Sequence, residues 1–281
     1  MKRELEEFFK DRQIDSLEDM NASMNEFVMK KCLDFAHQEL SPEHKKAHEY
    51  LEGIEKMNEK QALKKAQKAM DEFPDCLKAK MFFMSDKELF SYIKELEEML
   101  DNEEKRLVKT CFMKKYKKGL AFTLEGEDYL KGIEKLIHAY ISIHGYFKAS
   151  QLAEKVLLLD KTDTLGMRFI LAGLYACLEE EGKLMKLYRT RKEEFMPYLV
   201  SFMCLYYKRG EFEKAKEYLE LVNKKNPCFI PYIEANKEKK VSGKVKLGGE
   251  EEVAMIMDEM SYLFDSAPHI KEFIAKKGKV Y

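Results

Sequence analysis

Residues 210–227, GEFEKAKEYLELVNKKNP, contain the pattern that decides the fold. A glycine opens the stretch and a proline closes it. The small and apolar residues between them recur at steps of three and four, as on one face of a helix. These residues are Gly210, Phe212, Ala215, Tyr218, Leu219 and Pro227. Their spacing predicts the second helix of a helix-turn-helix repeat, with the glycine in the turn and the proline ending the helix.

The segment before Gly210 supplies the matching first helix of this pair. Its apolar residues have helical spacing and follow a proline, which is common in a first helical turn. They are Leu199, Phe202, Met203 and Tyr206, after Pro197. Residues 197–227 therefore read as one complete helix pair.

Two earlier pairs follow the same plan. Gly182 and Leu187 have the five-residue offset of Gly210 and Ala215, which predicts a turn at Gly182. Further upstream, a turn at Gly145 precedes Ala149, which stands 66 residues before Ala215, close to two periods of roughly 34 residues. We therefore expect three consecutive helix pairs within residues 127–226.

Helical patterns also continue on both sides of these pairs. Ser41-Pro42 marks a helix start, and Ala62, Ala66 and Ala69 before Phe73-Pro74 resemble another second helix. Earlier still, a longer amphipathic helix is predicted from Ser16. After a lysine- and glycine-rich loop, the apolar residues from Val253 to Phe264 predict one more helix, and a short one follows Ala267-Pro268. These terminal helices would cap the array.

The predicted fold class is all-α, a tetratricopeptide-like superhelix of helix-turn-helix repeats with N- and C-terminal capping helices. The expected organisation is an N-terminal helical segment (1–60), divergent repeat-like helices (61–126), three helix pairs (127–235), a flexible loop (236–249) and C-terminal capping helices (250–281). Only 6 prolines and 13 glycines in 281 residues agree with helices rather than a turn-rich β architecture.

Over nearly its whole length, the chain resembles the bacterial tetratricopeptide-repeat proteins related to the suppressor-of-tumorigenicity-seven family. The motifs that carry the resemblance are Phe8-Phe9, residues 16–21, Leu40-Ser41-Pro42, Pro74-Asp75-Cys76, Asp163 with Gly166 and Arg168, residues 226–233 and residues 249–252. The chain departs from the family near residues 122–130. It has no tryptophan and keeps only Tyr129 of an Arg-Pro-Tyr element. The resemblance implies a helical-repeat protein whose biochemical role is poorly defined.

Charge and composition restrict the partners. The 50 basic and 51 acidic side chains nearly cancel, which argues against nucleic acid and anionic membranes as partners. No stretch of roughly twenty apolar residues is present, and the charged first ten residues do not resemble a signal peptide. The six scattered cysteines form no CxxC pair, so we expect reduced, inert thiols and a cytoplasmic protein. Homo-oligomerisation stays open.

Chemical motifs are scarce. His44 and His48 stand four apart, but two ligands are too few for a specific metal site, so we predict surface histidines. Cys204 has no local histidine to activate it, and the Lys114–Lys118 run is expected to be a solvated helix end. The HExxH, GxGxxG and GxxxxGK[ST] motifs are all missing. We therefore predict a protein that is not an enzyme and has no cofactor and no metal.

The expected function is to bind a protein or peptide partner, as a scaffold or adaptor. In such repeats the first helix of each pair lines the binding surface. The predicted ligand-binding residues are Lys131, Glu134, His138, Arg168, Glu179, Tyr207 and Lys208. Their mixed charges leave the sign of the ligand open. Two alternatives are a regulatory receptor that holds a short peptide or small ligand inside the superhelix, and a nucleic-acid-binding helical repeat.

Overall fold

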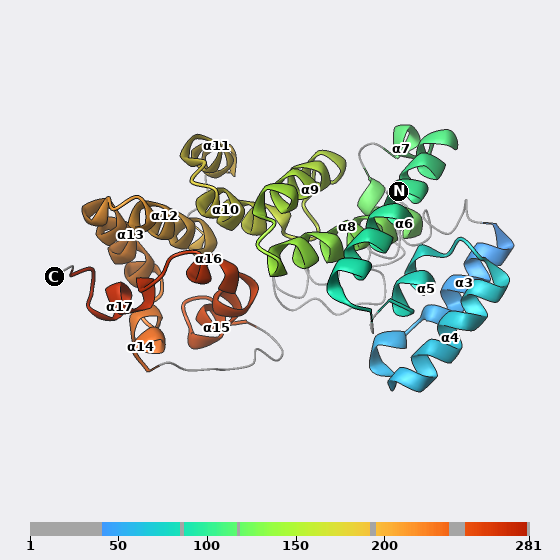
Figure 1. Ribbon diagram of the computed structural model, residues 1–281, viewed down its shortest axis with the longest axis horizontal. Helices are drawn as coiled ribbons and strands as arrows, with labels where there is room; N and C mark the ends of the chain where they lie inside the picture. The colour runs from blue at the N-terminus through green and yellow to red at the C-terminus, as the bar shows by residue number, and fades with distance from the viewer. Residues whose placement is uncertain (1–40, 85–86, 117–118, 192–194, 236–244, 280–281) are drawn as a thin grey trace, which may run out of the picture. The chain divides into compact units, whose positions relative to one another are not determined.

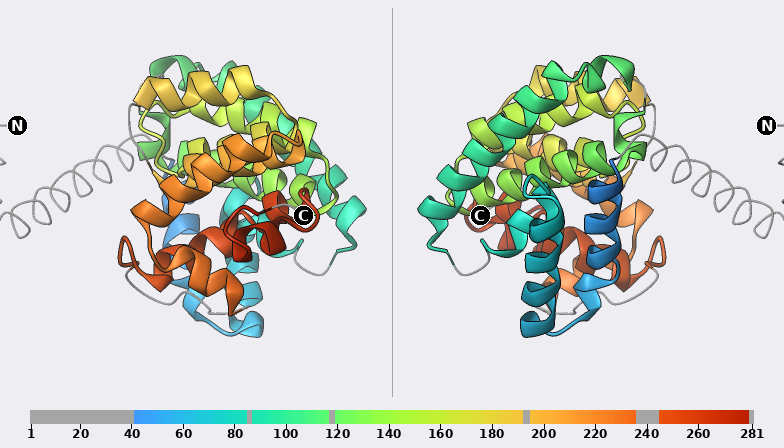
Figure 2. Two further views of the ribbon diagram at one scale, coloured as in Figure 1. Left: turned by 90° about the vertical axis from the view of Figure 1, so that its left-hand side faces the viewer. Right: turned by 90° about the vertical axis from the view of Figure 1, so that its right-hand side faces the viewer.

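The computed structural model describes residues 41–84, 87–116, 119–191, 195–235 and 245–279. Within these ranges every regular element is a helix and no strand occurs, as Figure 1 and the two side views of Figure 2 show. The all-α prediction is therefore confirmed. The helix predicted from Ser16 and most of the loop at 236–249 lie outside the described residues.

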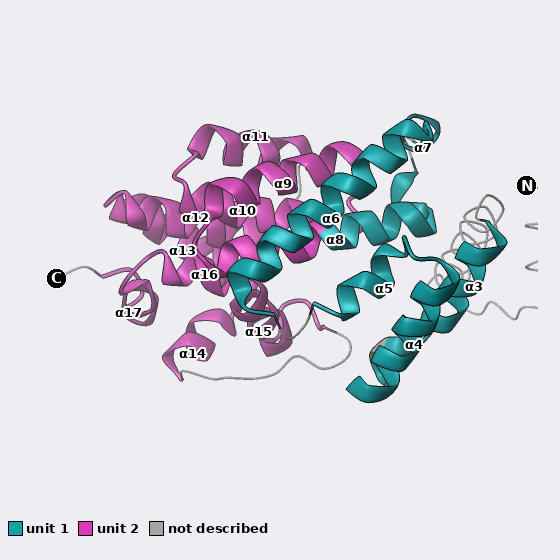
Figure 3. Ribbon diagram, turned by 45° about the vertical axis from the view of Figure 1, so that its right-hand side comes forward, with its two compact units in different colours: residues 1–132 teal, residues 133–281 magenta. Residues whose placement is uncertain are grey.

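The chain divides into two compact units, residues 1–132 and 133–281 (Figure 3). The boundary falls inside helix α8 (Leu124–Ser142). In unit 1 the described elements before α8 are α3 (Pro42–Leu51), η1 (Ile54–Lys56), α4 (Glu59–Glu72), α5 (Leu77–Phe82), α6 (Leu89–Lys109), α7 (Phe112–Lys115) and η2 (Leu120–Phe122). Unit 2 contains the rest of α8 and all later helices.

Local capping explains where α3 and α8 begin. The Ser41 hydroxyl accepts a hydrogen bond from His44 N at 3.1 Å, with Pro42 in the first turn, as expected for this pair of residues. Thr123 Oγ1 plays the same part for α8, accepting from Gly126 N at 3.1 Å. The α3–α4 hairpin closes on an apolar cluster that includes Ala47, Leu51, Ile54, Ala62, Ala66 and Ala69.

Residues 124–225 form three consecutive helix-turn-helix pairs. After α8 and α9 (Tyr146–Leu159) come α10 (Met167–Cys177) with α11 (Glu181–Arg191), then α12 (Met196–Lys208) with α13 (Phe212–Lys225). Helix α10 packs on both α9 and α12, so neighbouring pairs share a continuous core in unit 2. That core includes Phe202, Cys204 and Leu205, which are fully buried.

Three second helices share one register. Helices α4, α9 and α13 are each 14 residues long, and each buries its fourth, eighth and eleventh residues. These residues are Ala62, Ala66 and Ala69 in α4, Ala149, Ala153 and Val156 in α9, and Ala215, Leu219 and Val222 in α13. The residues that follow the helices are also alike: Phe73, Asp160 and Asn226 all have extended backbones with ψ between 93° and 96°. Helices far apart in sequence thus share their length, their buried positions and the backbone conformation at their ends.

The turn of the middle pair corrects the sequence prediction. The left-handed residue of each turn is His144 (φ 58°), Glu179 (φ 59°) or Gly210 (φ 72°). The amide of the residue that follows it donates to a tyrosine carbonyl and closes the turn. Gly182 lies inside α11, and Leu184, not Leu187, is the fully buried counterpart of Ala215. The predicted register was therefore three residues late.

The corrected register predicts opposite effects on stability for alanine substitutions at Gly210 and Gly182. Gly210→Ala should lower the free energy of unfolding by about 1 kcal/mol, because its φ of 72° disfavours a side chain. Gly182→Ala should instead raise it by about 0.5–1 kcal/mol, since Gly182 is an exposed helical residue with nothing within 4 Å of an added Cβ. Urea denaturation measures both. Equal effects of the two substitutions would contradict the corrected register.

The C-terminal segment of unit 2 contains α14 (Phe229–Glu234), α15 (Glu250–Glu259), α16 (Ser261–Asp265) and α17 (Ile270–Ala275). The single helix predicted over Val253–Phe264 is interrupted at Met260, whose φ of −117° and ψ of 23° are not helical. Asn226 anchors the segment: its Nδ2 donates to Gly249 O at 2.9 Å and to Glu252 Oε2 at 3.0 Å. The end of α13 is thereby tied to the start of α15.

Candidate functional site

The seven predicted ligand-binding residues fall in both units of the chain. Lys131 lies in unit 1, exposed, and forms an ion pair with Glu127 Oε1 at 2.6 Å. Glu134 and His138 lie further along α8, in unit 2, half-buried and exposed respectively. The remaining four are on or beside α10 and α12.

Arg168 is held by its own loop. Its Nη1 donates to Asp163 Oδ2 at 2.7 Å, and its guanidinium lies 4.4 Å from the centre of the Phe169 ring. The Asp163 side chain is fully buried, and burial raises its pKa more than Arg168 lowers it. Removing Arg168 would leave a buried acid without its cation, so the residue has a structural role here.

Glu179 and Lys208 do come together. Lys208 Nζ lies 4.0 Å from Glu179 Oε1 and donates to the Cys177 carbonyl at 2.5 Å, at the C-terminus of α10. The Tyr207 hydroxyl donates to Pro268 O at 3.0 Å. Lys208 and Tyr207 therefore join α12 to α10 and to the C-terminal segment.

The same C-terminal segment packs along α10 and α12. Helix α16 contacts both, and the Tyr262 hydroxyl donates to Ile170 O at 2.9 Å. Tyr262 is buried, Leu263 fully so, and Cys177 Sγ lies 3.4 Å from Ser266 Oγ. The segment also buries Phe264, Ile270 and Phe273. Because each such side chain contributes about 1.5–3 kcal/mol, displacing the segment would cost about as much as the whole stability of a domain. It is thus a fixed part of unit 2.

Two hollows stay open at the edge of this contact. One, of about 330 Å³, is lined by Tyr207, Lys208, Gly210, Phe212, Ser266, Ala267 and Pro268. The other, of about 200 Å³, is lined by Tyr207, Phe212, His269, Glu272, Phe273, Lys276 and Lys279. Tyr207 and Phe212 line both, with their ring centres 5.6 Å apart, and Phe273 lies 5.1 Å from Tyr207. We call these the Tyr207 hollows.

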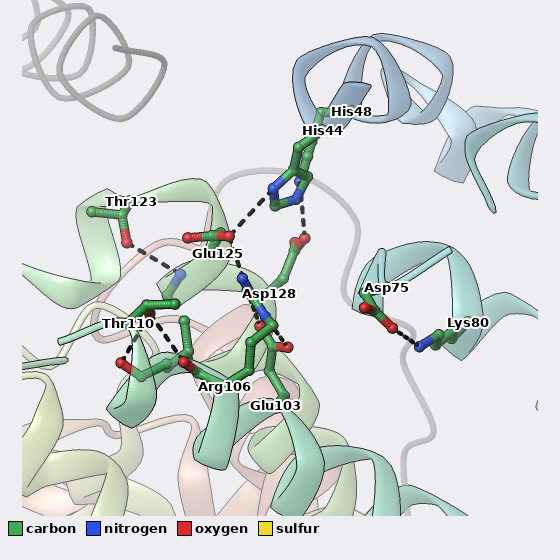
Figure 4. A network of polar contacts seen from close by, with 12 residues as sticks. His44, His48, Asp75, Lys80, Glu103, Arg106, Thr110, Thr123, Glu125 and Asp128 are labelled. Carbon is green, nitrogen blue, oxygen red and sulfur yellow. Dashed lines mark hydrogen bonds and ion pairs between the residues drawn. The ribbon is translucent and has the colours of Figure 1, made fainter. Parts of the chain in front are cut away.

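Unit 1 contains a buried polar cluster that the sequence did not predict (Figure 4). His44 and His48 project from α3 toward α8 and are only 5% and 7% exposed, so the prediction of surface histidines was wrong. Their Nε2 atoms are 3.2 Å apart. His44 Nδ1 lies 3.3 Å from Glu125 Oε1, and His48 Nε2 lies 3.3 Å from Asp128 Oδ2.

Helix α6 completes this histidine–carboxylate cluster. Arg106 Nη2 donates to Glu103 Oε1 at 2.6 Å and to Glu125 Oε1 at 2.9 Å. Burial raises the pKa of Glu125, but hydrogen bonds from His44 and Arg106 and the charge of Arg106 outweigh it, so the net pKa is lowered. Burial raises the pKa of Asp128 to about 7. One carboxyl is therefore held ionised while the other titrates near neutrality.

The cluster has a local sequence signal, the four-residue spacing of two histidines, but its carboxylates belong to a distant helix. Among the described residues no three His, Cys, Asp or Glu side chains form a metal-binding group. The described cysteines are free, and burial raises the pKa of Cys76 to about 11 and that of Cys204 well above its ordinary value. The chemistry that this part of the chain offers is proton exchange within the cluster.

Comparison with known proteins leaves the family unassigned. No family model matches the chain, and no curated protein matches it significantly. Among the described helices, none is long and apolar enough to cross a bilayer.

Proposed function

We propose that this chain is a non-catalytic helical-repeat protein of the tetratricopeptide type that binds a polypeptide partner as a scaffold or adaptor. The observation that carries the proposal is the common register of the second helices α9 and α13, with small or aliphatic residues buried at the same three positions. Stacked helix pairs of this kind present extended surfaces to peptides and partner helices. The resemblance to the suppressor-of-tumorigenicity-seven relatives supports the same proposal.

The Tyr207 hollows are the surface we propose for the partner. They include Tyr207 and Lys208, two of the predicted ligand-binding residues, and add Phe212, whose side chain is 36% exposed. The residues that line the hollows include three lysines, Lys208, Lys276 and Lys279, and one carboxylate, Glu272. Glu272 Oε1 lies 3.1 Å from His269 Nδ1. Aromatic surface beside an excess of cations fits an acidic peptide with an aromatic side chain.

Lys276→Glu should weaken binding of a labelled peptide rich in Asp, Glu and Phe about tenfold, equivalent to about 1.4 kcal/mol. The reason is charge reversal beside the aromatic hollow. Fluorescence anisotropy measures the dissociation constant. Lys224→Glu is the matched control, because Lys224 is also an exposed lysine of unit 2 but does not line the hollows. An equal effect of the two substitutions, or no peptide binding by the wild type, would count against this surface.

Phe212→Ser separates the aromatic contribution from the charge. It should weaken the same peptide while leaving α12 and α13 folded, because Phe212 opens onto both hollows. Lys208 is a poor choice for this test, since its ammonium also binds the last carbonyl of α10. Circular dichroism before and after the substitution checks the fold.

A further inference from the structure

The contact between the two histidine rings restricts how many protons the cluster can hold. Two ring nitrogens 3.2 Å apart need one hydrogen between them, because one must donate and the other accept. With two hydrogens in the gap, two N–H groups would point at each other. With no hydrogen in the gap, two nitrogen lone pairs would face each other. The geometry is therefore compatible with one proton in this gap.

Glu125 fixes which nitrogen donates. Its carboxylate is held ionised beside Arg106, so it accepts a hydrogen bond from His44 Nδ1 at 3.3 Å. A neutral His44 then has its lone pair on Nε2, and His48 Nε2–H must be the donor in the gap. The same hydrogen points toward Asp128 Oδ2, 3.3 Å away. In this state both imidazoles are neutral and the contacts between the two rings, with Glu125 and with Asp128 are satisfied.

The surrounding charges allow one additional proton but not two. Asp128 faces His48 and also feels Lys78 from α5, Glu103 from α6, and Glu127 and Lys131 from its own helix. Glu125 faces His44 and Arg106. One extra proton is accommodated on Asp128 or shared between Asp128 and His48. A second would put positive charge on both rings of a pair that is buried and 3.2 Å apart.

We infer that the histidine–carboxylate cluster is an acid-sensitive latch that holds the α3–α4 hairpin against α8 and opens when both histidines are protonated. The hairpin moves as one body, because His44 stacks on Phe73 at the end of α4 with ring centres 4.2 Å apart. Apolar contacts between α3 and α4 keep the hairpin closed on itself. The latch is independent of peptide binding at the Tyr207 hollows.

The sign of the pH effect follows from the proton count. Histidines in an opened hairpin take up their protons near pH 6.5, so the open state gains two below that pH. The closed state gains only one proton, at or near the Asp128 carboxyl. A difference of one proton changes the opening equilibrium about tenfold per pH unit. The full one-proton difference is present below about pH 5.5, where Asp128 in the closed state and both histidines in the open state have taken up their protons, so opening should increase about tenfold between pH 5.5 and 4.5.

Cys76 reports the opening. Its fully buried side chain feels the charge of Asp128 on α8, so separation of the hairpin from α8 should uncover it, whereas Cys111 in the same unit is exposed. The measured quantity is the rate at which dithiodipyridine modifies Cys76 divided by the rate at Cys111, resolved by peptide mass spectrometry. For the full-length protein this ratio should rise about tenfold from pH 5.5 to 4.5.

Two variants should move the pH dependence in opposite directions. His48→Gln keeps a donor near the position of Nε2 but cannot be protonated, so the rise should fall below about threefold. Asp128→Asn removes the group that accepts the extra proton, so the rise should become steeper than in the wild type. His138→Gln, which changes an exposed histidine of unit 2, should leave the ratio unaltered.

Three results would overturn the latch. The first is a wild-type ratio that does not change with pH. The second is a tenfold rise that persists in His48→Gln. The third is stoichiometric zinc in the purified protein that is lost in His48→Gln, because the rings would then share a metal ion rather than a proton. A steeper rise in Asp128→Asn supports the latch even where His48→Gln does not fold.

Discussion

Gly173→Ala is expected to lower the melting temperature of unit 2 by roughly 5–10 °C, or about 2–3 kcal/mol. A Cβ on Gly173 would lie 2.4 Å from the Tyr262 hydroxyl and 3.0 Å from Met260 Cε. Tyr262 cannot move away easily, because it is buried and its hydroxyl donates to Ile170 O. The higher helix propensity of alanine offsets about 1 kcal/mol of this loss. Differential scanning calorimetry measures the shift.

A double-mutant cycle with Tyr262→Phe tests whether the clash is the cause. Alone, Tyr262→Phe should cost about 1 kcal/mol, since it removes the hydrogen bond to Ile170. In the Gly173→Ala protein the same change should stabilise, because it deletes the atom that the new methyl group meets. Additive losses would show that the C-terminal segment does not pack on α10 as described.

This contact also covers part of the surface that the first helices were expected to offer to a partner. The first helices were expected to line an open surface, and the spacing of apolar residues gives no sign that α16 lies on α10 and α12. A small residue such as Gly173 within α10 is the one local hint of a close approach. The side chain that fills the space is almost ninety residues later, so no local pattern connects the two.

The helix pairs themselves could be predicted because their signal is local and periodic. Ala149 and Ala215 occupy the fourth positions of α9 and α13, where a small residue lets the neighbouring helix approach. The middle pair misled the prediction because Glu179, rather than a glycine, takes the left-handed position. The tyrosines would have given the correct register, since Tyr140, Tyr175 and Tyr206 each supply the carbonyl that closes a turn.

The histidine cluster could not have been predicted from α3 alone. Lys45 and Lys46 between the two histidines make this turn of the helix look solvated. Burial of His44 and His48 depends on two acids of α8 that reach them only in the folded unit. Similarly, the loop acid Asp163 engages Arg168, which the sequence assigned to a ligand. In both cases the side chain that pairs with the predicted residue lies outside the helix to which that residue belongs.

Arg106→Met is expected to destabilise unit 1 by about 3 kcal/mol at neutral pH. Arg106 bonds two carboxylates, Glu103 and Glu125, which are 8% and 9% exposed. Methionine fills much of the same volume but leaves both acids buried without their cation. Arg106→Lys retains the charge but not the planar fork of donors, so an intermediate loss is expected. Urea denaturation of the three proteins measures their free energies of unfolding, which should decrease from wild type to Arg106→Lys to Arg106→Met.

The pH dependence distinguishes loss of charge pairing from loss of packing in the Arg106→Met protein. In the wild type the pKa of Glu125 is lowered below its ordinary value of 4.5, so its contribution is present above about pH 4.5 and is lost as the pH falls through the folded pKa. Without Arg106, the hydrogen bond and charge of His44 are left to oppose the effect of burial, so the pKa of Glu125 should rise. The gap between wild type and variant should therefore narrow from pH 7 to pH 4. A gap that stays constant over this range would mean that the aliphatic stem of Arg106, and not its charge, stabilises the cluster.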